Sequence, residues 1–210
     1  MLLQVDWKAD HAAAMQNALE RRGPALVYFR AEACKRSKAL EEGPFAAGAI
    51  TSLLAGFVCV RVDVDHDEPN VRAKYGVRFT PTIVLIGRDG KRLGEIESFE
   101  TDAIAATLAE VLEKHRSPWC GSEKAALERA KKEKRPALLV KDEKAQARVH
   151  AALGELADGF AIAVVEEWKV DGPAWVVVDA GGETPRAVAT IALKDAKNEE
   201  LRAKVKELLK

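Results

Sequence analysis

One cysteine stands where its sulfur could act as a nucleophile. Cys34 follows an apolar run, residues 25–29, that predicts a buried strand, and it precedes a helix-forming segment, residues 37–42. Backbone N–H groups at the start of a helix lack helical partners and favour a negative charge there. They therefore stabilise a thiolate, which is the nucleophilic form of cysteine. The position of Cys34 predicts thiol chemistry.

The third residue after Cys34 is Ser37, which makes the motif C-x-x-S. A second thiolate at this position could attack a mixed disulfide and release the product, whereas a serine hydroxyl cannot. Ser37 can still donate a hydrogen bond to the Cys34 thiolate. The motif predicts a catalytic pair, Cys34 and Ser37, that attacks a disulfide and needs an external thiol, such as glutathione or a protein cysteine, to complete turnover.

Basic residues surround this motif. Lys35, Arg36 and Lys38 place positive charge beside the sulfur. They could contact an acidic partner or the carboxylates of glutathione, or they could form an ordinary solvated helix start.

Composition limits the remaining classes of function. The 210 residues carry equal numbers of acidic and basic side chains, which argues against a nucleic-acid-binding face built on bulk charge. The three cysteines do not suggest a disulfide framework, so we expect a reducing compartment and a cytoplasmic protein. We expect no signal peptide and no membrane span, because the N-terminus lacks a long apolar run. The four histidines show no ligand spacing, so we expect no metal.

Alternating helix and strand patterns predict an α/β fold in the first half of the chain. We expect a mixed sheet with helices on both faces over residues 1–116, ending in a helix from Thr101 to His115 with a Thr-Asp cap. Residues 117–122 predict a linker.

The pattern restarts in the second half, in shortened form. The A-L-E-R run that begins at Ala126 and the P-A-L run that begins at Pro136 echo the same letters at Ala18 and Pro24. We therefore expect residues 123–210 to form a second, degenerate copy. No cysteine follows its first strand, so this copy would perform no thiol chemistry.

Residues 5–115 resemble the thioredoxin superfamily through several pieces in family order. These pieces are Trp7, residues 25–29, Cys34, Lys38, Phe45, residues 60–65, Tyr75-Gly76-Val77, Thr80-Pro81-Thr82 and Asp89-Gly90-Lys91. The resemblance implies two tandem thioredoxin-like folds, of which only the first carries a thiol site. It also implies thiol–disulfide exchange as the activity, with protein or low-molecular-weight thiols and disulfides as partners.

The resemblance further implies site roles. Cys34 would be the attacking cysteine and Pro81 a cis-proline facing it, with the backbone of Thr80 presented to an extended peptide. Lys35 and Arg36, which replace the usual Gly-Pro, would also contact substrate.

Two other family positions differ in this chain. The usual tryptophan before the cysteine is Ala33, and the usual buried acid of the first strand is Tyr28. A proline before a strand of the second half, Pro173, would be a vestigial cis-proline.

Other uses of the fold stay open at this point. A redox-inactive interaction module would use the groove at Pro81 and leave Cys34 without chemistry, and a thiol ligand for a metal or cluster would need further ligands. Cys120 could be an internal resolving thiol on a flexible linker, or an ordinary linker cysteine. Glutathione, as an external thiol, is the one candidate cofactor, and the sequence does not determine the oligomeric state.

Overall fold

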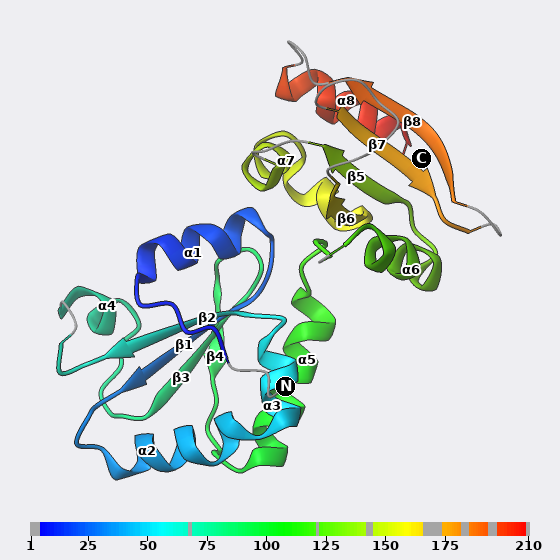
Figure 1. Ribbon diagram of the computed structural model, residues 1–210. Helices are drawn as coiled ribbons and strands as arrows, with labels where there is room; N and C mark the ends of the chain where they lie inside the picture. The colour runs from blue at the N-terminus through cyan, green and yellow to red at the C-terminus, as the bar shows by residue number, and fades with distance from the viewer. Residues whose placement is uncertain are drawn as a thin grey trace. The chain divides into compact units, whose positions relative to one another are not determined.

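The computed structural model describes residues 5–66, 69–120, 122–141, 145–165, 174–181, 185–192 and 197–208. It divides into two compact units, Met1–Arg116 and Ser117–Lys210. Each unit contains a four-stranded mixed sheet with helices on both faces, as predicted (Figure 1). No helix in these described ranges is long and apolar enough to cross a membrane.

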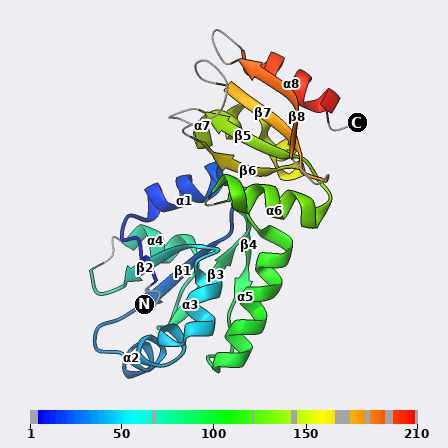
Figure 2. The same cartoon turned by 45° about the vertical axis from the view of Figure 1, so that its right-hand side comes forward.

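Unit 1 has strand order β2-β1-β3-β4, in which β1 and β2 are parallel and the other pairs antiparallel. Helices α1 and α4 pack on one face, and α2, α3 and α5 pack on the other, where α3 and α5 lie side by side (Figure 2). Its elements are α1 (His11–Glu20), β1 (Ala25–Arg30), α2 (Lys35–Glu42), the 3₁₀ helix η1 (Pro44–Ala46), α3 (Gly48–Leu54), β2 (Val58–Asp63), α4 (Pro69–Lys74), β3 (Thr82–Ile86), β4 (Arg92–Glu95) and α5 (Thr101–His115).

Strand β1 is the centre of unit 1. Residues 25–29 are fully buried because both faces of the sheet are covered. Leu26 and Tyr28 point to the face of α2, α3 and α5, while Val27 and Phe29 point to the face of α1 and α4. The strand therefore holds a fixed position, and Cys34 follows directly after it.

Unit 2 has strand order β6-β5-β7-β8, with the same parallel and antiparallel pairs in the same places. Helix α6 covers one face and α7 and α8 the other. Its elements are α6 (Glu123–Glu133), β5 (Ala137–Lys141), α7 (Ala145–Leu153), the 3₁₀ helix η2 (Gly154–Gly159), β6 (Ala161–Val164), β7 (Ala174–Asp179), β8 (Arg186–Ala192) and α8 (Asn198–Leu208).

Fine details repeat between the two units. Arg22 and Lys134 both adopt a left-handed backbone, with φ of 47° and 52°, in the turn that precedes the first strand of each unit. This conformation is uncommon for residues other than glycine. Strands β4 and β8 also share an irregularity against their partners, at Leu93 and Val188, and both of these side chains are exposed. Such shared details indicate an internal repeat rather than a chance likeness.

Aligning the two A-L-E-R runs, which begin at Ala18 and Ala126, would pair the two units in the wrong register. Pro24 corresponds to Pro136, because each stands directly before the first strand of its unit. Counting back from these prolines, Ala18 corresponds to Ala130, not to Ala126. Both alanines are buried on the sheet-facing side of their helices. The two A-L-E-R runs thus lie one helical turn apart, because a repeated burial pattern does not require repeated letters.

Within the predicted linker, residues 117–122, the described residues 117–120 pack in unit 2 and are not a free linker, which corrects the prediction for them. Trp119 is 9% exposed and packs in the core of unit 2, where it forms a β-bridge with Ile162. The Cys120 N–H donates to the carbonyl oxygen of Ile162 at 2.6 Å. These residues continue the sheet of unit 2, so Cys120 is not on a flexible segment.

Two smaller predictions concern single positions. The predicted Thr-Asp cap of α5 is wrong, because Glu100 occupies the N-cap and Thr101 is the first helical residue. Pro173, proposed as a vestigial cis-proline, lies outside the described residues.

We expect Trp119→Ala to destabilise unit 2 by about 3–5 kcal/mol, the usual cost of removing a large buried aromatic side chain. Urea unfolding followed by circular dichroism measures this loss. Val188→Ala is the control, since Val188 is 52% exposed in the same unit and should change stability by less than about 0.5 kcal/mol. A similarly small effect of Trp119→Ala would mean that residues 117–122 are a linker after all.

Candidate functional site

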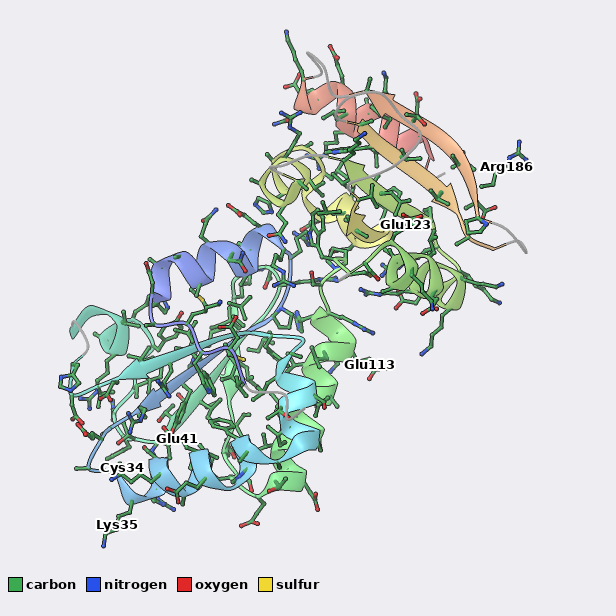
Figure 3. All side chains as sticks on the ribbon, in the orientation of Figure 1. Cys34, Lys35, Glu41, Glu113, Glu123 and Arg186 are labelled. Carbon is green, nitrogen blue, oxygen red and sulfur yellow. The ribbon has the colours of Figure 1, made fainter. Side chains whose placement is uncertain are left out.

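Cys34 occupies the N-cap of α2, with extended backbone angles of φ −77° and ψ 108°. Strand β1 ends four residues earlier, at Arg30, and α2 begins at Lys35. The cysteine is partly exposed, so its sulfur is accessible. Figure 3 shows Cys34 at the start of α2 and Lys35 directed away from the fold.

The segment before β3 faces this cysteine. The Cys34 thiol donates to the carbonyl oxygen of Thr80, with 3.4 Å between sulfur and oxygen. The Thr80–Pro81 peptide bond is cis, and Pro81 is buried. The two segments meet because β1 and β3 are antiparallel neighbours, with Phe29 opposite Thr82. The structure thus brings together Cys34, Thr80 and Pro81, three of the residues that the sequence analysis selected.

The surroundings of Cys34 favour its thiolate. The pKa of Cys34 lies below its ordinary value, chiefly because of a hydrogen bond from the Ser37 side chain. The backbone N–H groups of Ser37 and Arg36 and the side chain of Thr80 lower this pKa further, against a smaller opposing effect of burial. The contact with the Thr80 carbonyl belongs to the neutral thiol, whereas the N–H and hydroxyl donors belong to the thiolate.

Ser37 is the buried member of the site. Its side chain is fully buried, and its hydroxyl makes no hydrogen bond of ordinary geometry with another group in the described part of the chain. The hydroxyl therefore has no competing partner among the described residues. A buried hydroxyl without a partner is unfavourable, so a thiolate at Cys34 gives Ser37 the acceptor that it lacks.

The basic side chains beside Cys34 are not the largest cause of its lowered pKa. Lys35, Arg36 and Lys38 are exposed, and within the described residues none forms an ion pair. Their charges are not among the causes that lower the pKa of Cys34. Hydrogen bonds at the helix start lower this pKa, and the exposed cations are left to contact solvent or a partner.

The sequence analysis missed a partly buried polar network behind the site. The Tyr28 hydroxyl lies 3.2 Å from the Ser37 carbonyl oxygen and 3.2 Å from Glu41 Oε1. Glu41 also pairs with Arg30 at 2.8 Å, and Arg30 pairs with Asp63 at 2.9 Å. Burial raises the pKa of Tyr28, so its hydroxyl stays protonated and donates to one of its two acceptors.

One sequence signal could have revealed part of this network. Arg30 and Asp63 are the last residues of the parallel strands β1 and β2 and lie opposite each other in the sheet. A basic and an acidic residue at the ends of two neighbouring strands could have indicated their ion pair. The carboxylate near the site comes from Glu41 on α2, and the first strand supplies Tyr28 in place of an acid. Sequence spacing gives no reason to select Glu41, because seven residues and nearly two helical turns separate it from Cys34.

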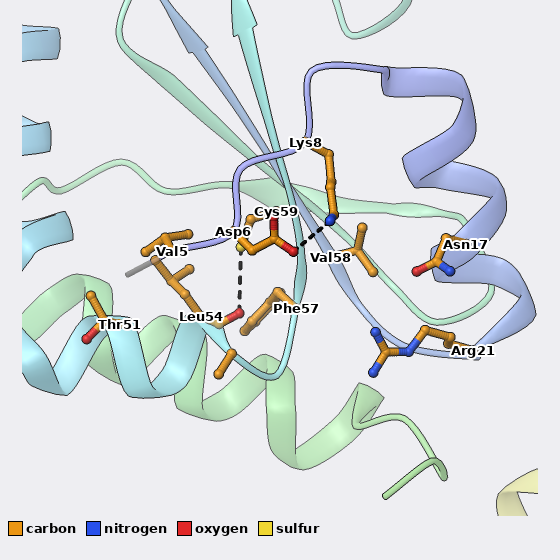
Figure 4. Close-up of a pocket in the computed structure, with 11 residues that line it drawn as sticks. Val5, Asp6, Lys8, Asn17, Arg21, Thr51, Leu54, Phe57, Val58 and Cys59 are labelled. Carbon is orange, nitrogen blue, oxygen red and sulfur yellow. Dashed lines mark hydrogen bonds and ion pairs between the residues drawn. The ribbon is translucent and has the colours of Figure 1, made fainter. Parts of the chain in front are cut away.

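Cys59 lies away from this site. It stands near the start of β2, opposite the first residues of β1, whereas Cys34 follows the end of β1. Burial raises the pKa of Cys59 to about 12, and its sulfur lies 3.6 Å from the Leu54 carbonyl oxygen. A cavity of about 500 Å³ adjoins it, lined in part by the ion-paired Asp6 and Lys8 (Figure 4). Cys59 is thus a core residue.

Metal binding gains no support from side-chain positions. Among the described residues, no group of three or more His, Cys, Asp or Glu side chains could hold a metal ion.

Comparisons with known proteins identify the fold. Residues 6–87 match the model of a thioredoxin-like family. Among solved structures, a thioredoxin from Thermus thermophilus is 24% identical and covers 55% of this chain and 91% of its own, with a TM-score of 0.48. A disulphide isomerase from Xylella fastidiosa Temecula1 is 20% identical, covers 51% of this chain and 98% of its own, and has a TM-score of 0.42.

Human ERp44 is 16% identical and covers 98% of this chain and 58% of its own, with a TM-score of 0.42. No curated protein sequence matches the chain. The match over residues 6–87 agrees, for that part of unit 1, with the thioredoxin-like fold expected from the sequence.

We expect Ser37→Ala to raise the pKa of Cys34, because it removes the largest stabilising contact of the thiolate. Alkylation by iodoacetamide, measured against pH, should then rise at higher pH than in the wild type and be slower at pH 7. Ser52→Ala is the control, since the exposed Ser52 hydroxyl donates only to the Gly48 carbonyl oxygen. Identical profiles for wild type and Ser37→Ala would show that Ser37 does not act on the sulfur.

We expect Tyr28→Phe to cost about 1 kcal/mol of stability, because it removes a buried hydroxyl donor and leaves acceptors unsatisfied. Urea unfolding measures the loss, and the pKa of Cys34 should remain depressed in this variant. An unchanged unfolding midpoint would mean that the contacts at Ser37 and Glu41 contribute nothing net.

Proposed function

We propose that the thioredoxin-like unit 1 carries out thiol–disulfide exchange through Cys34, and that an external thiol completes each turnover. The observation that carries the proposal is the accessible Cys34 sulfur, stabilised as a thiolate at the start of α2 and facing Thr80. The substrates are protein or low-molecular-weight disulfides. The expected reactions are isomerisation, thiol capture or removal of glutathione, rather than net reduction by a dithiol.

The chemistry takes two exchange steps. The Cys34 thiolate attacks one sulfur of the substrate disulfide, a new bond forms from Cys34 to that sulfur, and the other substrate sulfur leaves as a thiolate. An external thiolate then attacks the mixed disulfide and displaces Cys34 as a thiolate. In each step one S–S bond forms and one breaks, so the number of disulfides is unchanged.

The resolving thiol must come from outside because no cysteine of the chain is suited to the role. Ser37 occupies the position of a resolving cysteine and cannot form a disulfide. Cys59 is buried with a raised pKa, and Cys120 is bound into the sheet of unit 2. Glutathione or a protein thiol supplies the missing sulfur, and Lys35 and Arg36 give its carboxylates a favourable surface.

The proposed setting is reducing and cytoplasmic. Three unpaired cysteines suit such a compartment. The equal numbers of acidic and basic residues favour thiol and disulfide partners over nucleic acid.

A second candidate is a redox-inactive interaction module. Phe79, which is 79% exposed beside the Thr80–Pro81 segment, favours it because an exposed aromatic side chain can dock a partner without any chemistry at Cys34. Partner capture separates the two functions. If exchange occurs, Cys34→Ala should lose the partners that dithiothreitol releases from the wild-type protein. If Cys34 is inert, Cys34→Ala should keep all partners.

We expect wild-type protein mixed with a disulfide-bonded peptide to form a covalent adduct at Cys34, visible by mass spectrometry and released on addition of glutathione. Ser37→Cys should release the peptide without glutathione, because the new thiol at position 37 attacks the adduct from within the chain. Rapid quenching with acid followed by mass spectrometry measures both species over time.

Two matched variants control this experiment. Cys120→Ser should form the adduct at the wild-type rate, and Cys34→Ser should form none. If wild type forms no more adduct than Cys34→Ser, then Cys34 performs no exchange and the interaction module is the better account.

A further inference from the structure

We propose that Phe79 is the residue that selects substrate, and that the substrate is an extended polypeptide with an apolar side chain next to its disulfide cysteine. This inference rests on the proposed exchange at Cys34 and goes beyond it by naming the substrate class. Phe79 is an exposed large apolar residue of unit 1, and it immediately precedes Thr80, whose carbonyl oxygen lies 3.4 Å from the Cys34 sulfur.

Side-chain hydrogen bonds fix the backbone around Phe79. Four consecutive carbonyl oxygens, those of residues 77–80, accept hydrogen bonds from side chains. The donors are Arg72 Nε to Val77 at 3.0 Å, Arg72 Nη2 to Arg78 at 3.0 Å, Thr82 Oγ1 to Phe79 at 2.8 Å and Cys34 Sγ to Thr80 at 3.4 Å. The aromatic ring is therefore held in an exposed position by the bonded segment beneath it.

The same segment leaves its N–H groups open. The N–H groups of Arg78, Phe79 and Thr80 donate to no group among the described residues. The segment therefore offers its N–H groups as hydrogen-bond donors to a partner. The carbonyl oxygens of an extended peptide chain are acceptors of this kind.

Charge adds a second preference. Arg78 and the three cations at the start of α2 are exposed, and within the described residues none forms an ion pair. Glu32 and Asp65 are exposed acidic residues nearby, joined through the Glu32 N–H and an Asp65 carboxylate oxygen at 2.8 Å. Cations outnumber acids around the sulfur, so a peptide with acidic residues is favoured over a basic one.

A small thiol does not account for Phe79. Glutathione offers carboxylates for the cations but has no apolar side chain to cover an aromatic ring. Ala33, which precedes Cys34, is also exposed and offers only a methyl group. Phe79 is therefore the large apolar contact surface beside the sulfur.

The test measures exchange rates of purified full-length protein with synthetic peptides, each carrying one cysteine in a disulfide with a fluorescent thiol. The peptides place Leu or Ser on both sides of the cysteine, with Asp or Lys further out. Bis(2-hydroxyethyl) disulfide serves as a small substrate that cannot reach Phe79. The variants are Phe79→Ala, Phe79→Leu and, as the matched control, Leu93→Ala, which removes another exposed apolar side chain of unit 1.

We expect Phe79→Ala to slow exchange with the Leu peptides by about fivefold to tenfold, the effect of losing part of an apolar contact. The rate with bis(2-hydroxyethyl) disulfide should stay at the wild-type value, Phe79→Leu should retain most of the rate with the Leu peptides, and Leu93→Ala should match wild type. Asp peptides should react faster than Lys peptides, and added salt should reduce that difference.

Three results would overturn the inference. Equal rates of wild type and Phe79→Ala with the Leu peptides would remove its basis, and an equal loss on every substrate would indicate damage to the loop instead. A dimer in sedimentation that Phe79→Ala converts to a monomer would assign Phe79 to a second copy of the chain. Failure of the proposed function is seen separately, as no reaction of wild type above Cys34→Ser with any disulfide.

Discussion

The contact between the Cys34 sulfur and the donors at the start of α2 is the interaction on which the site depends. The Ser37 hydroxyl and the N–H groups of Arg36 and Ser37 stabilise negative charge on the sulfur. They can do so because α2 begins directly after Cys34, at a fixed distance from the fully buried strand β1. The burial of β1 therefore determines where the sulfur lies and which groups surround it.

In the proposed function, serine in place of a second cysteine allows the first step of thiol–disulfide exchange but not the second from within the chain. A hydroxyl and a thiol can both donate to the Cys34 thiolate, so the proposed nucleophilic attack does not require a second thiol. Only a thiol of the same chain could release the substrate internally, and serine is not a thiol. Release would therefore depend on a thiol that arrives from solution. The accessible segment from Arg78 to Thr80 would then matter more, because the proposed adduct would persist until another thiol arrives.

The two units share topology but not chemistry. Strand order, a left-handed residue before the first strand and an irregular edge strand recur in both. Trp119 and Cys120, which a linker would leave loose, instead extend the sheet of unit 2. Short connecting segments carry few periodic signals, and whether they pack depends on a neighbouring strand that sequence inspection does not place.

The sequence by itself determined the order of elements, the nucleophile and the missing second thiol, because apolar periodicity and residue type are local properties. Cys34 and Ser37 could be selected from that information, whereas Thr80 and Pro81 were selected from the resemblance to the thioredoxin superfamily. Only the tertiary structure decided that hydrogen bonds, not Lys35 and Arg36, depress the pKa of Cys34. It also revealed the carboxylate of Glu41 behind the site and the exposure of Phe79. These features depend on which groups meet across strands and on which of them are shielded from water, and neither property is encoded in spacing along the chain.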